Sequence, residues 1–193
     1  MRTAEISRST KETQIAVKLD LDSGGKVNIN SGIGFFDHML TALAVHGGFS
    51  LDVQCKGDLY VDGHHSVEDI GIVLGLAFKE ALGDKSGIMR YGTASIPMDE
   101  ALGWCCLDIS ARPFLVFMAE FKNERIGEFE TCLVEEFMRA FAFNAGITLH
   151  IKAEYGTNDH HKVEAMFKAL AYALKQAVKK NETGAAISTK GTL

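Results

Sequence analysis

The segment Gly57-Asp-Leu-Tyr-Val-Asp-Gly-His-His-Ser-Val-Glu68 has a counterpart in Glu154-Tyr-Gly-Thr-Asn-Asp-His-His-Lys-Val-Glu164. Both contain the motif His-His-x-Val-Glu, and the second copy follows the first by 96 residues. Each copy stands after an alternating apolar stretch, which predicts a strand, and at the start of a stretch with helical apolar spacing. The same motif in the same context indicates an internal duplication of a unit of about 90 residues.

The sequence around each motif predicts the rest of its unit. In the first unit, strands are expected over 15–21 and 51–55, and a turn at 23–26 predicts that 27–30 pairs back as a hairpin. Helices are expected over 35–46 and from about 65 to 82. The second unit predicts strands over 101–109, 114–121 and 147–151, with helices over 130–143 and 160–178.

These elements predict an α/β fold of the two-layer α+β kind. The chain of 193 residues is long enough for a substantial core without disulfides. We predict one domain over 1–193, built from repeats at about 1–90 and about 91–180, with a C-terminal tail at 181–193.

Composition narrows the possible partners and location. The formal net charge is -5, which argues against a nucleic-acid-binding or anionic-membrane surface. The apolar stretches are shorter than a membrane span requires. Four cysteines occur without a Cys-x-x-Cys pair and are typical of reduced thiols. We therefore expect a cytoplasmic protein with no nucleic-acid or membrane partner.

The repeated motifs indicate a metal site. On a helix, Glu68 lies three and four positions after its two histidines, so its carboxylate can neighbour either imidazole. Adjacent histidines point about 100° apart, which predicts that each serves a different ion or a different side of a subunit boundary. His38, in Phe35-Phe-Asp-His-Met-Leu40, is a natural further ligand. Imidazole and carboxylate donors without thiolate favour Mn(II) or Fe(II), with Co(II) and Zn(II) also suited.

The sequence pattern leaves the roles of several other polar residues open. His46 stands at the end of a predicted helix, and His150 alternates with apolar residues of a predicted strand, so neither is expected as a ligand on pattern alone. Asp99-Glu100 either takes part in catalysis or caps a strand end. Four cationic residues could hold a phosphate monoester, which suits arginine forks and lysine charges. They are Arg90, Arg112, Lys168 and Lys190.

Motifs along the whole chain carry a resemblance to a known family. They are Phe35-Phe-Asp-His-Met-Leu40, His46-Gly-Gly-Phe49, Gly57-Asp58, His64-His-Ser-Val-Glu-Asp69, Pro97-Met-Asp-Glu100, Asp108-Ile-Ser-Ala-Arg-Pro113, Asn158-Asp-His-His161 with Glu164, and the Ser/Lys-Gly tail. Together they closely resemble imidazoleglycerol-phosphate dehydratase, the dehydratase of histidine biosynthesis. The resemblance implies two halves like the second domain of ribosomal protein S5, each a four-stranded sheet packed on helices. It also implies two Mn(II) ions per active site and a homo-oligomer of 24 subunits, with active sites between subunits.

The resemblance also implies roles for individual residues. The implied metal ligands are His38, His64, His65, Glu68, His160, His161 and Glu164. The implied substrate contacts are Glu12, Arg90, Arg112, Lys168, Ser188 and Lys190. Where the family often has a further histidine ligand, this chain has Glu136. Either Glu136 binds the metal in its place, as a carboxylate can, or the ligand is missing, or His150 substitutes for it.

The implied reaction dehydrates imidazoleglycerol phosphate to imidazole acetol phosphate. No carbonyl acidifies the hydrogen that is lost, so we expect a metal-bound imidazolate to expel the hydroxyl. Glu12 is the expected base for the proton on the next carbon, with Glu68 and Glu164 as alternatives.

Three rival functions follow from the same residues. A two-metal phosphoesterase acting on a small phosphate monoester would share the metal and phosphate groups, although such sites usually need several aspartates. A non-enzymatic metal-binding assembly protein would not need Glu12, Arg90 or Arg112. An RNA-binding module is suggested only by the S5-like fold, and the acidic net charge weighs against it.

Overall fold

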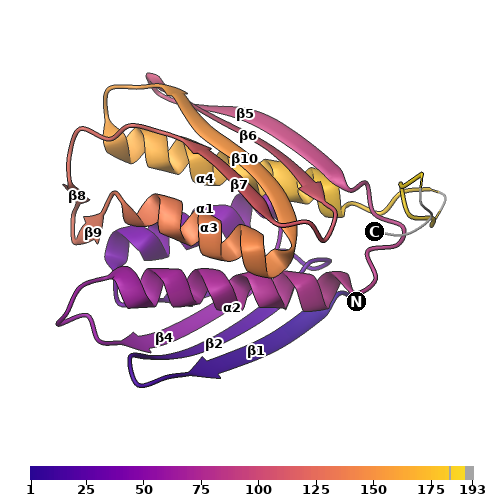
Figure 1. The fold of residues 1–193 in the computed structure, drawn as a ribbon, viewed down its shortest axis with the longest axis horizontal. Helices are drawn as coiled ribbons and strands as arrows, with labels where there is room; N and C mark the ends of the chain where they lie inside the picture. The colour runs from indigo at the N-terminus through magenta and orange to yellow at the C-terminus, as the bar shows by residue number, and fades with distance from the viewer. Residues whose placement is uncertain (183, 190–193) are drawn as a thin grey trace.

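Four helices lie between two four-stranded sheets in the computed structural model, which describes residues 1–182 and 184–189 (Figure 1). The first half contains β1 (Thr3–Ser9), β2 (Thr13–Asp20), β3 (Val27–Asn30), α1 (Gly34–Gly47), β4 (Ser50–Gly57) and α2 (His64–Leu82). The second contains β5 (Tyr91–Met98), β6 (Ala101–Ile109), β7 (Phe114–Met118), β8 (Arg125–Ile126), β9 (Phe129–Glu130), α3 (Leu133–Ala145), β10 (Ile147–Tyr155) and α4 (Asp159–Val178). Among the described residues, no helix is both long and apolar enough to cross a membrane.

The two halves have the same topology. The strand orders are β1-β2-β4-β3 and β5-β6-β10-β7. In each sheet the third strand in sequence lies parallel to its only neighbour, and the other pairs are antiparallel. The second half differs by the short hairpin β8–β9, inserted before α3. The predicted mixed fold of two duplicated halves is confirmed.

The predicted hairpin between β2 and β3 is wrong. β2 pairs with β1 on one side and with β4 on the other, so it has no free edge for β3. β3 instead lies beyond β4 and runs parallel to it. The sequence interpretation overlooked β1, and the corresponding β5, because their polar residues mask the apolar alternation. It also began the third helix at 130, where Phe129–Glu130 form β9 instead.

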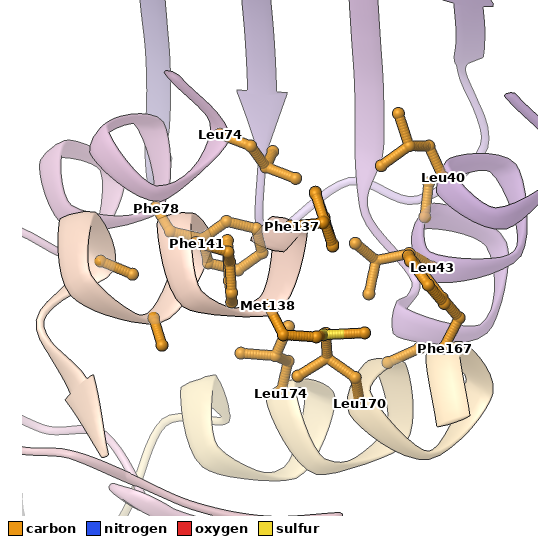
Figure 2. Close-up of a cluster of buried hydrophobic side chains, with 14 of the residues drawn as sticks. Leu40, Leu43, Leu74, Phe78, Phe137, Met138, Phe141, Phe167, Leu170 and Leu174 are labelled. Carbon is orange, nitrogen blue, oxygen red and sulfur yellow. The ribbon is translucent and has the colours of Figure 1, made fainter. Parts of the chain in front are cut away.

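The core joins the two halves through their helices. α1 packs against α4, and α2 packs against α3, so each contact pairs a helix of one half with a helix of the other. Figure 2 shows buried side chains of all four helices meeting, among them Leu43, Leu74, Phe137 and Leu170. Burying such apolar side chains is the main source of stability. Neither half therefore has a complete core of its own.

α4 approaches its sheet closely because small residues line the contact. The predicted alanine face of this helix is buried, including Ala165 and Ala173. A Cβ atom at Gly103 on β6 would lie 2.4 Å from the backbone carbon of Ala165, and one at Gly92 on β5 would lie 1.9 Å from the carbonyl oxygen of Ala173. Only glycine fits at these two positions, which fix the height of α4 above the sheet.

The starts of the helices gather at one end of the molecule. At the left of Figure 1 lie the β1–β2 turn, the β5–β6 turn and the first turns of α2 and α4. At the right lie the end of α4 and the described residues that follow it. Both His-His motifs therefore stand at the same end of the fold.

Candidate metal centre

Three predicted ligands from both halves come together. His38 is in the first half on α1, and His160 and Glu164 lie one turn apart on α4. One ligand atom from each lies within 4.8 Å of the other two. The Glu164 carboxylate is 3.2 Å from Nε2 of His160 and 3.6 Å from Nε2 of His38. The packing of α1 on α4 is what brings these residues together.

Lys168 fixes the second oxygen of this carboxylate. It lies one turn after Glu164, and its Nζ is 2.7 Å from Oε1. Burial raises the pKa of Glu164, but the hydrogen bond and charge of Lys168, together with His38 and His160, outweigh burial and lower it overall. Glu164 is therefore held as a carboxylate, with Oε2 directed at the two imidazoles. The sequence prediction that Lys168 shares the face of Glu164 is confirmed.

The duplication places a similar set on α2 and α3. His64 Nε2 lies 3.8 Å from Glu68 Oε2. Glu136 is the fourth residue of α3 and His38 the fifth residue of α1, so both lie near the starts of equivalent helices. Its carboxylate contacts Arg139 at 3.8 Å. Within the described chain, the group of three with ligand atoms this close is the one on α1 and α4.

The second histidine of each motif turns away from the first. The rings of His160 and His161 are 6.0 Å apart and inclined by 83°, and those of His64 and His65 are 6.4 Å apart and inclined by 81°. The sequence predicted this divergence from the helix geometry. Adjacent histidines therefore cannot serve one ion within the chain.

A carboxylate holds Nδ1 of each outward-turned histidine. Glu100 Oε2 lies 2.7 Å from Nδ1 of His161, and the Asp58 oxygens lie 3.1 and 3.2 Å from Nδ1 of His65. These hydrogen bonds are the largest cause of a raised pKa at both histidines. Nothing in the sequence alone assigned this role to Asp58. Its place just before the motif at the end of β4 was the available signal.

Glu12 stands in the β1–β2 turn next to His65. Its Oε1 lies 3.9 Å from His65 Nε2, and its side chain is 55% exposed. Thr10 Oγ1 accepts hydrogen bonds from the backbone N–H groups of Glu12 and Thr13, which fixes the turn. Thr13 Oγ1 in turn donates to the buried carboxylate of Asp69 on α2. The turn thus presents Glu12 on a rigid support beside the start of α2.

Two of the predicted phosphate contacts, Arg90 and Arg112, meet at Asp108. Arg90 is buried and binds both Asp108 oxygens, at 2.7 and 3.0 Å, and the carbonyl oxygen of Ile187 at 2.6 Å. Arg112 is largely exposed and reaches Asp108 at 3.4 Å. Ile187, which contacts Arg90, directly precedes Ser188. Lys190 lies outside the described residues.

The phosphate cluster and the metal ligands lie at opposite ends of α4. The backbone of Arg90 bonds to the carbonyl of Ala177, near the end of the helix, whereas His160 stands at its start. At 1.5 Å per residue these points are about 26 Å apart. Lys168 lies between these two points on α4. One small substrate cannot reach both clusters of the same chain.

The remaining histidines lie outside this centre. His46 ends α1 and packs beside Tyr172, with ring centroids 5.7 Å apart. Burial first, and then the charge of Lys168, lowers its pKa. His150 is exposed on β10, as the alternation predicted, and is not part of the described metal group.

Comparisons with known proteins agree along the whole chain. The sequence profile of a family described as imidazoleglycerol-phosphate dehydratase matches residues 31–174. The chain is 58% identical over 193 residues to imidazoleglycerol-phosphate dehydratase of Acetivibrio thermocellus, covering 100% of this chain and 99% of that protein. It is 56% identical over 194 residues to the Streptococcus thermophilus protein of the same name, covering 100% of both.

Solved structures show the same fold. The crystal structure of imidazoleglycerol-phosphate dehydratase from Staphylococcus aureus aligns with a TM-score of 0.85 at 42% identity, covering 93% of this chain and 99% of that chain. The Pyrococcus furiosus structure, in complex with (S)-C348, aligns with a TM-score of 0.82 at 39% identity, covering 97% and 100%. On the family profile and these identities, the chain belongs to the imidazoleglycerol-phosphate dehydratase family.

Proposed function

We propose that this enzyme, a hydro-lyase that dehydrates imidazoleglycerol phosphate to imidazole acetol phosphate in histidine biosynthesis, works at a two-ion Mn(II) site formed between subunits. The observation that carries the site is the convergence of His38, His160 and Glu164, whose ligand atoms lie within 4.8 Å of one another. Two imidazoles and a carboxylate, without thiolate, suit Mn(II).

The donor set fits such an ion. Glu164 is held ionised and aimed by Lys168, and the two histidines present Nε2 to the same oxygen. A second ion would be held by His64 and Glu68, with Glu136 as the carboxylate replacement for the ligand that is often histidine. When bound, the metal would supply Lewis acidity to the imidazole ring of the substrate.

Each ligand set is incomplete in one chain. Three protein ligands leave room for more at a six-coordinate ion, and His65 and His161 point away from the sets of their own chain. We infer that these histidines complete the ion sites of neighbouring copies. The distance along α4 supports the same inference, because the substrate phosphate and the substrate ring would then contact different chains.

Glu12 is the base that the geometry favours. Glu164 is committed to Lys168 and has a lowered pKa, which makes it a weaker proton acceptor. Glu68 faces His64 as a ligand. Glu12 is exposed in a fixed turn, and among the described residues its ion-pair contact is with His65, 3.9 Å away. It can take the proton from the carbon beside the hydroxyl-bearing carbon.

Arg90, Arg112, Lys168 and the tail residues Ser188 and Lys190 would bind the phosphate. Arg90 forms the support, because its guanidinium links Asp108 to the tail at Ile187. Arg112 has a free donor face and stands 67% exposed, ready to fork onto phosphate oxygens. Fixing the phosphate would hold the reacting carbons in the correct orientation. Such positioning lowers the activation barrier.

On the family resemblance seen in the sequence, we also propose that 24 subunits assemble into one homo-oligomer. Exposed apolar side chains such as Tyr60 and Val61, beside the start of α2, offer surface for such contacts. We also propose that the enzyme acts in the cytoplasm, where its free cysteines stay reduced.

The test is turnover by chelator-stripped protein with and without added Mn(II), with ketone and free phosphate measured together. The expected result is ketone formation only with Mn(II), without phosphate release. Full turnover by the stripped protein would contradict the metal proposal. Phosphate release would instead favour the two-metal phosphoesterase considered from the sequence.

A further inference from the structure

Glu100 has a set of contacts that the proposed reaction does not use. It stands in the β5–β6 turn, and its Oε1 accepts hydrogen bonds from the backbone N–H groups of Thr157 and Asn158, at 2.9 and 2.7 Å. The Thr157 hydroxyl also donates to it, at 3.2 Å. Its other oxygen, Oε2, lies 2.7 Å from His161 Nδ1. The carboxylate thus ties the segment before α4 to the second histidine of the motif.

This arrangement fixes which nitrogen of His161 carries the proton. A carboxylate oxygen can only accept, so Nδ1 is the protonated nitrogen and donates to Glu100. In the neutral ring, Nε2 then keeps its lone pair and is the nitrogen able to bind a metal. Nε2 has only a distant described charge partner, Asp99 Oδ2 at 3.8 Å.

The first half contains an independent case of the same arrangement. Asp58 holds Nδ1 of His65 at 3.1 and 3.2 Å, and the charge partner of His65 Nε2 among the described residues, Glu12, is likewise distant at 3.9 Å. The two carboxylates come from different places, the end of β4 and the β5–β6 turn. The duplication alone therefore does not explain why both outward histidines are held through Nδ1.

We propose that Glu100 and Asp58 are positioning residues that fix His161 and His65 with the proton on Nδ1, so that each presents Nε2 to an ion beyond its own chain's ligand set. The proposal rests on the proposed Mn(II) function. Carboxylates behind a ligating histidine commonly set its orientation and basicity, and their loss commonly lowers metal affinity 10- to 100-fold.

The two carboxylates predict different responses to the same amide substitution. In Glu100→Gln, the backbone N–H groups of Thr157 and Asn158 hold the amide oxygen in place of Oε1, so the amide nitrogen must face His161. Two donors cannot face one another, so Nδ1 must give up its proton and Nε2 must carry it. In Asp58→Asn, both oxygens of the native carboxylate face His65, so the amide can turn its oxygen toward Nδ1.

The experiment titrates the full-length, metal-stripped protein with Mn(II) and measures free Mn(II) by electron paramagnetic resonance. In Glu100→Gln, half of the bound Mn(II) is expected to bind about 10- to 100-fold more weakly, while the thermal midpoint of the metal-free protein is unchanged. Asp58→Asn likewise removes the negative charge beside the corresponding histidine, His65. Because the asparagine oxygen can still accept the hydrogen bond from Nδ1, Mn(II) binding is expected to weaken less than about threefold.

His161→Ala separates failure of this proposal from failure of the proposed function. If His161→Ala weakens Mn(II) binding but Glu100→Gln binds as tightly as wild type, the positioning role is overturned and the metal function stands. Equal weakening by Glu100→Gln and Asp58→Asn would also overturn it, since charge alone would then explain the loss. If His161→Ala binds Mn(II) with full affinity and stoichiometry, His161 is not a ligand and the proposed site fails.

Discussion

The carboxylates of Glu164 and Glu12 differ in how many of their oxygen atoms already contact a neighbouring side chain. Lys168 occupies one oxygen of Glu164 and leaves the other for His38 and His160. Glu12, by contrast, extends from its turn with its carboxylate largely exposed. The two carboxylates therefore differ in what they already contact, which is why we propose Glu164 as a metal ligand and Glu12 as the base.

Replacing the carboxylate of Glu12, the proposed base, is expected to slow proton transfer while leaving the structure intact. Glu12→Gln keeps the turn, because Thr10 bonds the backbone and not the side chain. Loss of a general base typically costs about 10²- to 10⁴-fold in kcat. Steady-state kinetics should give this fall, with Mn(II) content and oligomer size equal to wild type. An unchanged kcat would remove Glu12 from the chemistry.

The Arg2–Asp22 ion pair makes a pH-dependent contribution to the free energy of unfolding. Hydrogen bonding from Arg2 is the largest cause that lowers the pKa of Asp22 from 3.8 to about 2. Since the folded-state pKa is the lower one, the pair stabilises the fold fully above about pH 4 and loses this effect as the pH falls toward 2.

Comparison of wild type with Asp22→Asn measures this contribution. The pair is partly exposed, so screening limits the expected difference to at most about 1 kcal/mol near pH 6. Urea unfolding of metal-free protein at several pH values should show the difference between the two curves shrinking as the pH falls from 4 through about 2. A difference that stays constant over this pH range would contradict the assignment to the ion pair.

At the scale of elements, close packing of α4 on its sheet depends on glycine. A methyl group at Gly103 would meet the backbone of α4 at Ala165, which cannot move aside without lifting the helix. Overpacking of this kind typically costs about 1–3 kcal/mol. Gly103→Ala is therefore expected to lower the free energy of unfolding by about this amount.

The matched control for this prediction is Gly34→Ala. Gly34 begins α1 and has nothing within 4 Å of the position that an added methyl group would take, so the substitution is expected to be neutral or slightly stabilising. Chemical denaturation of both variants tests the prediction. Equal stability of the two variants would show that α4 accommodates the methyl group.

The sequence predicted some helices and strands better than others. Helices with strong apolar spacing, such as α2 and α4, were located to within one residue. The edge strands β1 and β5 were missed, because half of each is solvent-exposed and carries polar residues. Missing β1 left β2 with an apparent free edge, and this caused the wrong hairpin with β3.

The candidate site was predictable in part for a related reason. The repeated motif predicted imidazole and carboxylate groups for a metal site, and helix periodicity predicted the divergence of His160 from His161. His38 lies close to Glu164 because α1 packs against α4, a helix of the other half. No local sequence pattern encodes this packing. The hold of Glu100 on His161 is likewise a contact between distant segments.

At the scale of the whole molecule, the distance between the metal ligands and the phosphate cluster predicts complementation between copies. Glu12→Gln and Arg112→Ala should each be inactive or nearly so. If a site takes Glu12 from one chain and Arg112 from another, random co-assembly restores both groups in about a quarter of the sites. Unfolding both variants together and reassembling them should therefore recover up to about that fraction of wild-type activity.

The control is to reassemble each variant alone, which should recover none. If both residues acted from one chain, every site in the mixed assembly would lack one of them, and the mixture would stay inactive. Arg112 suits this test because its side chain is mostly exposed, so its truncation leaves the fold undisturbed.

The pairing of helices across the two halves also says something about origins. A lone ancestral unit would have had no partner for its own two helices except those of a second copy, arranged about a twofold axis. Such a dimer would have carried two identical ion sites, each with one histidine from one copy and a His-His-x-x-Glu set from the other. Fusion of the two copies would have freed the two sites to diverge, and such divergence would explain why α1 carries His38 near its start whereas α3 carries Glu136.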